Sequence, residues 1–207
     1  MQTASNDTSE QTVAARLAEF LEGAFESVAL TRREHFRQHP DRRPAHQDIA
    51  SIIASYSNLN GLTAAGANLV PGPLGALTIV PELMIIIRNQ IQMIYDIGVA
   101  QGKEVHLNGD LLLAIFYTVT GGGAIGLAAV KGGQLLVKRA SLRIIQRIII
   151  WLGGKITQRA LRALLARWVP IAGSVAMGVW ARQSTIQMGK KAADLLAREI
   201  VLEQFEE

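Results

Sequence analysis

The chain has 207 residues, a formal net charge of +4 and a hydrophobic content of 49%. That length is sufficient for one domain with a substantial core, and the absence of cysteine excludes a disulfide framework and thiolate chemistry. Only 18% of the residues are charged and the mean hydropathy is +0.22, a combination that indicates deep burial or contact with a membrane.

The first part of the chain predicts a polar tail followed by one long helix. Residues 1–11 contain no apolar run, unlike a secretory signal, and are expected to be disordered. Val13, Leu17 and Val28 belong to a series of apolar residues at helical spacing, with glutamates between them. They predict an amphipathic helix of roughly 25 residues, which ends at a loop with two prolines near residue 40.

The central part of the chain is nearly uncharged. No charged residue occurs between Asp48 and Glu82, and the Pro/Gly cluster at 71–75 favours a buried hairpin or a re-entrant segment over one spanning helix. A further helix is predicted over 83–99. The uncharged run 111–130 is just long enough to cross a bilayer, although its glycines weaken it as a straight helix.

Polar side chains follow one face of the helix predicted over 83–99. Four of them are separated by seven, three and four residues, the spacing of a helical stripe, and an arginine flanks them. The isoleucines around them are too numerous to be left in water, so we expect this helix to be central and its polar groups to find partners inside the bundle or to line a wet cavity. This polar stripe consists of Glu82, Arg88, Asn89, Gln92 and Asp96.

The most uneven feature of the sequence is a cationic segment. Residues 131–191 contain twelve basic residues and no acidic one. Helical periodicity predicts two basic amphipathic segments, at 134–152 and 155–168, separated by Gly153 and Gly154. Each has a tryptophan near its end, where an anchor at a membrane interface would lie.

The absence of acids from this segment decides which partner we expect. Surface helices normally alternate acids with bases so that the two can pair at i, i+4. An apolar and purely cationic segment favours an anionic membrane surface, where apolar side chains enter the acyl boundary and basic ones meet lipid phosphates. A solvated face, an acidic protein partner (the chain's own acidic ends included) and nucleic acid are the alternatives, and the last is disfavoured because aromatic residues are not interleaved. The residues expected to bind lipid are Lys138, Arg139, Arg143, Arg147, Lys155, Arg159, Arg162 and Arg167.

A last helix is predicted from Pro170 toward Gln204, with a small and uncharged first half and a charged end. The β-branched runs are isoleucines within helical periodicity, so no strand is expected. The predicted fold class is therefore all-α: a single helical bundle over 12–207 with Gly-rich apolar central helices and basic amphipathic helices.

One glycine pattern matches a nucleotide-binding motif in its letters. Gly121-x-Gly123-x-x-Gly126 is the dinucleotide fingerprint, which needs a strand before it, a helix after it and an acid about twenty residues later. Position 146 is a glutamine, and two further glycines at 132–133 interrupt the required helix. We therefore expect a helix before the glycines, close helix packing around them, and no nucleotide cofactor.

No pattern in the sequence predicts catalysis or metal binding. His35 and His39 lie one helical turn apart and could share a metal ion, but the prolines that follow leave no third ligand in a fixed geometry. No Ser–His–acid set or pair of carboxylates stands out. We expect no catalytic residue, no metal and no cofactor.

Two stretches resemble the EcsC family. The first combines a Gly/Pro-rich turn at 71–75, the step Pro81-Glu82 and an apolar helix that ends near Tyr95; the second is the small-residue run 168–178. Both patterns also occur in the helical domain attached to some bacterial GTPases of the YcjF type. The resemblance covers roughly residues 55–200. It implies a bacterial, helical, membrane-associated protein and implies no catalytic residues.

These observations predict a non-enzymatic accessory or regulatory protein that binds anionic lipid, and with it a membrane protein complex, at the cytoplasmic face of the inner membrane. Its attachment is expected to be peripheral. The first alternative is an integral channel-like or pore-forming protein, with 49–81 and 111–130 inserted in the bilayer and the polar stripe lining a path. The second alternative is an enzyme that acts on a lipid-like substrate within the bundle.

Overall fold

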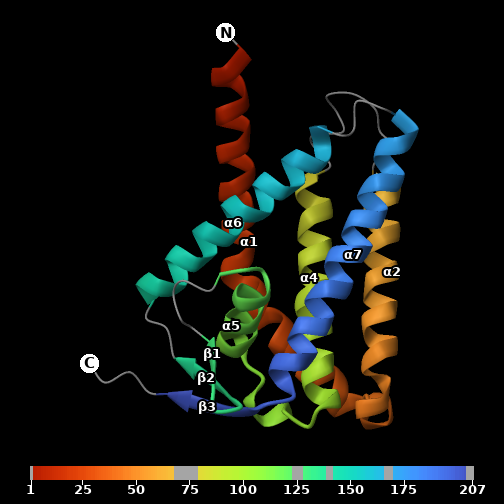
Figure 1. Ribbon diagram of the computed structural model, residues 1–207, viewed down its shortest axis with the longest axis vertical. Helices are drawn as coiled ribbons and strands as arrows, with labels where there is room; N and C mark the ends of the chain where they lie inside the picture. Colours follow the sequence, from red (N-terminus) through yellow and green to blue (C-terminus); the bar gives the residue numbers. More distant parts are fainter. Residues whose placement is uncertain (1, 68–78, 123–127, 139–141, 166–169, 204–207) are drawn as a thin grey trace.

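The computed structural model describes residues 2–67, 79–122, 128–138, 142–165 and 170–203 (Figure 1). Most of these residues are helical, and three short strands form a small sheet beside the helices. The helices are α1 (Gln2–Gln38), α2 (Ile49–Ala67), α4 (Ile79–Ala100), α5 (Gly109–Val119), α6 (Leu142–Leu165) and α7 (Pro170–Leu196), and the strands are β1 (Ala128–Lys131), β2 (Gln134–Lys138) and β3 (Glu199–Glu203).

Helix α4 is the centre of the bundle. It packs against α1, α2, α5 and α7, and Ile91, Met93 and Ile94 have no exposed surface. Figure 1 shows α2, α4 and α7 side by side, with α6 crossing α1 at a steep angle. The prediction of a central helix over 83–99 is confirmed, because an apolar surface this wide can be covered only by neighbours on several sides.

Helix α1 has the amphipathic pattern that the sequence predicts. Leu17, Leu21 and Val28 are buried against the core, whereas the glutamates between them are exposed. The helix begins at Gln2, so it includes residues 2–11, which the sequence predicts to be a disordered tail. No proline and no glycine precedes position 23, so nothing in the backbone ends the helix once its packed part has formed.

Glycine allows two pairs of helices to approach closely. A Cβ on Gly178 of α7 would lie 2.9 Å from the carbonyl oxygen of Gly61 in α2, and a Cβ on Gly153 of α6 would lie 2.8 Å from that of Ala14 in α1. Both distances are shorter than side chains tolerate. The prediction that Gly153 and Gly154 separate two segments is wrong, because both lie within the continuous helix α6.

The sheet corrects the expectation that the chain has no strands. β1 and β2 form an antiparallel hairpin whose two turn residues, Gly132 and Gly133, have φ values of 59° and 83°. Such a two-glycine turn suits the twist of a hairpin. The hairpin buries Leu135 and Val137, so the first basic segment predicted at 134–152 contains the strand β2 as well as the first residues of α6.

The third strand comes from the other end of the sequence. β3 pairs with β2 in parallel, with Leu135 opposite Ile200. Helix α7 therefore ends at Leu196 and does not continue toward Gln204 as the sequence predicts. Ile200 is buried in the strand, whereas an extra helical turn would leave its apolar side chain exposed to water. Burial of this side chain therefore favours the strand over a longer helix.

Across the described parts of the chain, none of the helices combines the length and the apolar character needed to cross a bilayer. The run 111–130, predicted as a candidate span, is divided: α5 ends at Val119, and β1 begins at Ala128. The predicted hairpin at 49–81 corresponds to α2 and the first residues of α4, and its Pro/Gly-rich middle lies outside the described residues.

Candidate functional site

A buried ion pair joins α1, α2 and α4. Nε and Nη2 of Arg32 donate to Oδ1 and Oδ2 of Asp96, each at 2.8 Å, and the Tyr56 hydroxyl donates to Oδ2 of Asp96 at 2.9 Å. Only 6% of Asp96 is exposed. The Arg32 guanidinium also lies over the Phe36 ring, 4.6 Å from its centroid. The planar fork of arginine matches a carboxylate in this two-bond geometry, so the contact fixes how three helices meet.

Burial governs the protonation of this cluster. Removal from water raises the pKa of the Asp96 carboxyl, and the charge of Arg32 opposes that rise. Burial, with the charge of Asp96 second, raises the pKa of the Tyr56 hydroxyl, which therefore keeps its proton and donates it. Arg32 and Tyr56 thus both hold the Asp96 carboxylate, and the cluster connects three helices.

A chain of amides and a hydroxyl connects α2, α4 and α7. Asn89 Nδ2 donates to Asn60 Oδ1 at 2.8 Å, and Asn60 Nδ2 donates to Thr185 Oγ1 at 3.0 Å. Gln90 Nε2 donates to the same oxygen at 3.2 Å, and Thr185 donates in turn to the carbonyl of Ala181 at 2.8 Å. Asn60 and Thr185 have no exposed surface, so this network satisfies polar groups that would otherwise be costly to bury.

All residues of the polar stripe therefore lie on one helix, α4, as predicted, but they have different surroundings. Asp96 and Asn89 find partners inside the bundle, and Glu82 is buried as well. Gln92 is half-buried, and Arg88 is exposed. The sequence does not identify the partners, namely Arg32, Tyr56, Asn60, Gln90 and Thr185, because they lie on other helices or on another side of α4.

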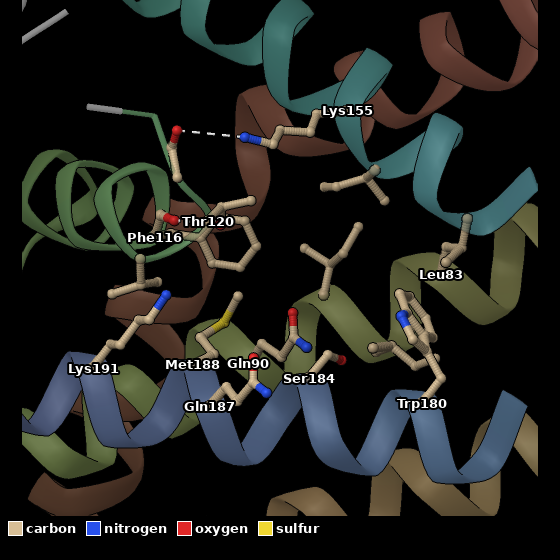
Figure 2. Close-up of a pocket in the computed structure, with 15 residues that line it drawn as sticks. Leu83, Gln90, Phe116, Thr120, Lys155, Trp180, Ser184, Gln187, Met188 and Lys191 are labelled. Atoms are coloured by element: carbon tan, nitrogen blue, oxygen red, sulfur yellow. Dashed lines mark hydrogen bonds between the residues drawn. The ribbon is translucent and has the colours of Figure 1, made fainter. Parts of the chain in front are cut away.

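A cavity of roughly 250 Å³ opens between α4, α5, α6 and α7 (Figure 2). Its walls are mostly apolar and include Ile87, Phe116 and Trp180. Two lysines also line it, Lys155 from α6 and Lys191 from α7, and no acidic residue is among the described side chains that line it. The cavity is thus both apolar and cationic.

The surroundings of Lys155 place its charge at one end of the cavity. Its Nζ donates to the carbonyl oxygen of Gly121 at 3.4 Å and lies 4.2 Å from the centroid of the Trp151 ring. In Figure 2 the ammonium groups of Lys155 and Lys191 lie on the side of the cavity away from Trp180, with Thr120 and Phe116 between them. Gly121, with φ of 98°, lies two residues beyond the end of α5, and its carbonyl oxygen accepts the bond from the lysine.

The basic residues predicted to bind lipid do not share one face. Arg143 and Arg147 are exposed on the outer side of α6, and Ile150, which is 67% exposed, follows one turn later. Lys155 lies about 120° round the helix from Arg143 and about 80° from Arg147, since each residue turns the helix by about 100°, and it faces the cavity.

The other residues of the predicted set are placed only in part. Lys138 belongs to β2, and Arg159 and Arg162 belong to α6, where their side chains lie outside the described part. Arg139 and Arg167 lie outside the described residues altogether. The structure therefore brings together Arg143 and Arg147 but separates both from Lys155.

Part of the cationic segment lies beside acids from the same chain. β3 runs along β2, so that Lys138 is in register with Glu203 and Gln134 with Glu199. Gln134 Nε2 donates to Glu199 Oε2 at 2.8 Å. The acidic end of the chain is thus a neighbour of the strand, one of the alternatives that the sequence leaves open, whereas no described acid pairs with Arg143 or Arg147.

The structure describes part of the glycine pattern at 121–126 and both of the histidines, His35 and His39. Residues 111–119 are helical, which confirms that a helix precedes Gly121; Gly123 and Gly126 lie outside the described residues. The described residues contain no group of three or more side chains that could hold a metal ion. The rings of His35 and His39 lie 5.2 Å apart, and burial, with the charge of Arg32 second, lowers the pKa of His35.

Comparisons with family models, with curated proteins and with solved structures find no match to this chain. The resemblance to the EcsC family accordingly stays a prediction. The candidate surfaces are the outer face of α6 and the cavity, because the ion pair and the amide network are buried and satisfied from within.

Proposed function

We propose that this protein is a peripheral, non-enzymatic membrane protein that attaches to anionic lipid through the outer face of α6. The observation that carries the proposal is that Arg143, Arg147 and Ile150 follow one another at four and three residues and are all exposed. α6 contains no acidic residue along its 24 residues. A surface helix without acids cannot neutralise its own positive charge. Lipid phosphates would supply the negative charge that it lacks.

The geometry suits a helix that lies flat on the membrane. Arg143 and Arg147 would meet phosphates, and Ile150, one turn beyond Arg147, would enter the acyl boundary. Each basic residue near an anionic surface contributes about 1 kcal/mol. The two arginines therefore supply roughly 2 kcal/mol, about a thirty-fold effect on binding, which salt screens.

The cytoplasmic leaflet of the bacterial inner membrane is the anionic surface that this proposal implies, and a membrane protein complex bound to it is the accessory partner. The resemblance to the EcsC family agrees with such a location.

Flotation with lipid vesicles tests this proposal. The wild-type protein should float with vesicles of phosphatidylethanolamine and phosphatidylglycerol, should not float with phosphatidylcholine alone, and should be released when salt rises from about 0.1 M to about 1 M. The double variant Arg143→Glu/Arg147→Glu should lose at least thirty-fold in affinity. Ile150→Ser should weaken binding at about 0.1 M salt and leave its salt dependence unchanged, since it removes only the apolar contact.

A matched control keeps the change in net charge the same. Arg42 and Lys190 are also exposed but lie on other elements, so Arg42→Glu/Lys190→Glu alters the total charge equally without touching α6. This control should float like the wild type. Equal loss in the two double variants, or equal flotation with neutral and anionic vesicles, contradicts the proposal.

A further inference from the structure

The cavity between α4, α5, α6 and α7 is lined by a buried amide with an oxygen left to accept a hydrogen bond. Gln90 of α4 is only 6% exposed, and its Nε2 donates to Thr185 Oγ1 at 3.2 Å. In Figure 2 the amide nitrogen of Gln90 lies toward α7, and the amide oxygen is turned away from α7 toward the space of the cavity. Among the residues that the structure describes, none donates a hydrogen bond to this oxygen.

The hydrogen bonds of Thr185 fix the orientation of this amide. The Thr185 hydroxyl donates its hydrogen to the Ala181 carbonyl at 2.8 Å, so its oxygen can only accept from other groups. Asn60 and Gln90 therefore both present their amide nitrogens to it. A flipped Gln90 would place its oxygen against an oxygen that has no hydrogen left to give. The group that Gln90 offers to the cavity is consequently an acceptor.

The other walls of the cavity suit a flat apolar ring. Phe116 and Trp180 lie on opposite sides of it (Figure 2), and Ile86, Ile87 and Met188 also line it. Aromatic side chains pack against a ring edge-to-face or offset, and a thioether sulfur makes favourable contacts with a ring edge. A charged ligand would lose its hydration among these apolar walls, so a neutral one is favoured.

The volume sets the size of the ring. An apolar cavity of about 150 Å³ takes one molecule of benzene, so that each non-hydrogen atom corresponds to about 25 Å³. At the same ratio, the roughly 250 Å³ of this cavity hold about ten non-hydrogen atoms. Two fused rings reach this size, whereas a phospholipid is too large to enter whole.

We propose that this cavity binds a small, neutral, bicyclic aromatic compound that carries an N–H or O–H donor, with its rings between Phe116 and Trp180 and its donor on Gln90 Oε1. Such a ligand satisfies an acceptor that otherwise faces an apolar space, and this hydrogen bond makes the site selective. Binding in this way requires no contact with the two lysines that also line the cavity.

Titration calorimetry with ring compounds of matched size tests the class of ligand. Indole should bind with a dissociation constant below about 1 mM. Benzofuran, which has an oxygen in place of the N–H, should bind about ten-fold more weakly because it cannot donate to Gln90. N-methylindole, which has lost the donor, should likewise bind more weakly than skatole, which carries its methyl group on carbon. Absence of indole binding, or equal binding within either pair, would overturn the proposal.

Replacing Gln90 tests the donor contact within the molecule. Gln90→Met keeps nearly the same shape without a strong acceptor, so it should weaken indole about ten-fold and leave benzofuran unchanged. Thr185 keeps its hydrogen bond from Asn60 in this variant. Gln183→Met, at an exposed position of α7 outside the cavity, should alter neither affinity. An equal effect of Gln90→Met on the two ligands, or no effect on indole, would refute the contact.

A second pair of variants tests the cavity without changing a buried residue. Gln187 is exposed and lines the cavity, whereas Gln183, one turn earlier on α7, is exposed and does not line it. Gln187→Trp should narrow the cavity and weaken indole and benzofuran alike, and Gln183→Trp should weaken neither. Unchanged affinities in Gln187→Trp would place the ligand elsewhere.

Binding in the cavity and attachment to lipid are separable. Arg143, Arg147 and Ile150 are not among the residues that line the cavity. Arg143→Glu/Arg147→Glu should therefore lose flotation with vesicles but bind indole like the wild type. Gln90→Met should show the reverse, so that the failure of either proposal leaves the other standing.

Discussion

The contact between Arg32 and Asp96 offers the sharpest test of how the bundle is held together. Replacing Asp96 with leucine removes the acceptor of two hydrogen bonds from Arg32 and one from Tyr56. The Arg32 side chain is only 19% exposed, so its charge would be left largely out of water without a counter-ion. Breaking one partner of such a pair costs about 3–5 kcal/mol.

That cost is large beside the total stability of a domain, which is about 5–15 kcal/mol. For a chain of this size it corresponds to a fall in Tm of roughly 6–20 °C. From the sequence alone we expect only a modest loss of stability for Asp96→Leu, since the sequence does not reveal that Arg32 is its partner. The structure raises the expected loss, because the Asp96 carboxylate accepts three hydrogen bonds that connect three helices.

A double-mutant cycle measured by urea unfolding separates the pair from the rest of the bundle. Arg32→Met and Asp96→Leu should each be strongly destabilising, and the double variant should lose less than their sum by at least about 1.5 kcal/mol. Arg37→Ala, which breaks the exposed pair between Arg37 and Glu34, should leave the free energy of unfolding unchanged within error. Additive single effects at Arg32 and Asp96 would refute the reasoning.

Further predictions concern packing and pH. Gly153→Ala should destabilise the protein by about 1–3 kcal/mol because its Cβ would lie 2.8 Å from the Ala14 carbonyl, whereas Gly154→Ala, which meets nothing within 4 Å, should stabilise it by about 0.5–1 kcal/mol; chemical unfolding compares the two. The pKa of His35 is lowered in the folded state, so stability present above pH 6.5 should decline as pH falls through the lowered value. His35→Gln should remove that decline in urea titrations at several pH values, and His39→Gln should not.

The helices could be predicted where the apolar period is long, and the strands could not. α1 and α4 each repeat their apolar positions over several turns, which is a strong local signal. The strands of the sheet have four or five residues, too few for alternation to be distinguished from helical spacing. The pair Gly132-Gly133 is typical of a hairpin turn, although the sequence was interpreted only as an interrupted helix there, and the partner of β3 lies far away in sequence and leaves no local trace.

Of the buried polar clusters, only the residues that share one helix could be predicted. The spacing of Asn89 and Asp96 places both on one face of α4, whereas their partners Asn60 and Arg32 are 29 and 64 residues away. A single sequence contains no signal for such distant pairs. The basic residues were grouped by charge along the chain, but a helix turns by about 100° at each residue, so Lys155 faces the cavity and Arg143 faces outward.

The parallel pairing of β2 with β3 sets the order in which the molecule can assemble on the ribosome. Gln134 is made 65 residues before its partner Glu199, and at about 5–20 residues per second β2 waits roughly 3–13 seconds for the strand that covers its edge. During that interval α6 and α7 are synthesised. The nascent hairpin therefore exposes an unpaired edge until β3 has been made, and such an edge can pair with another chain and start aggregation.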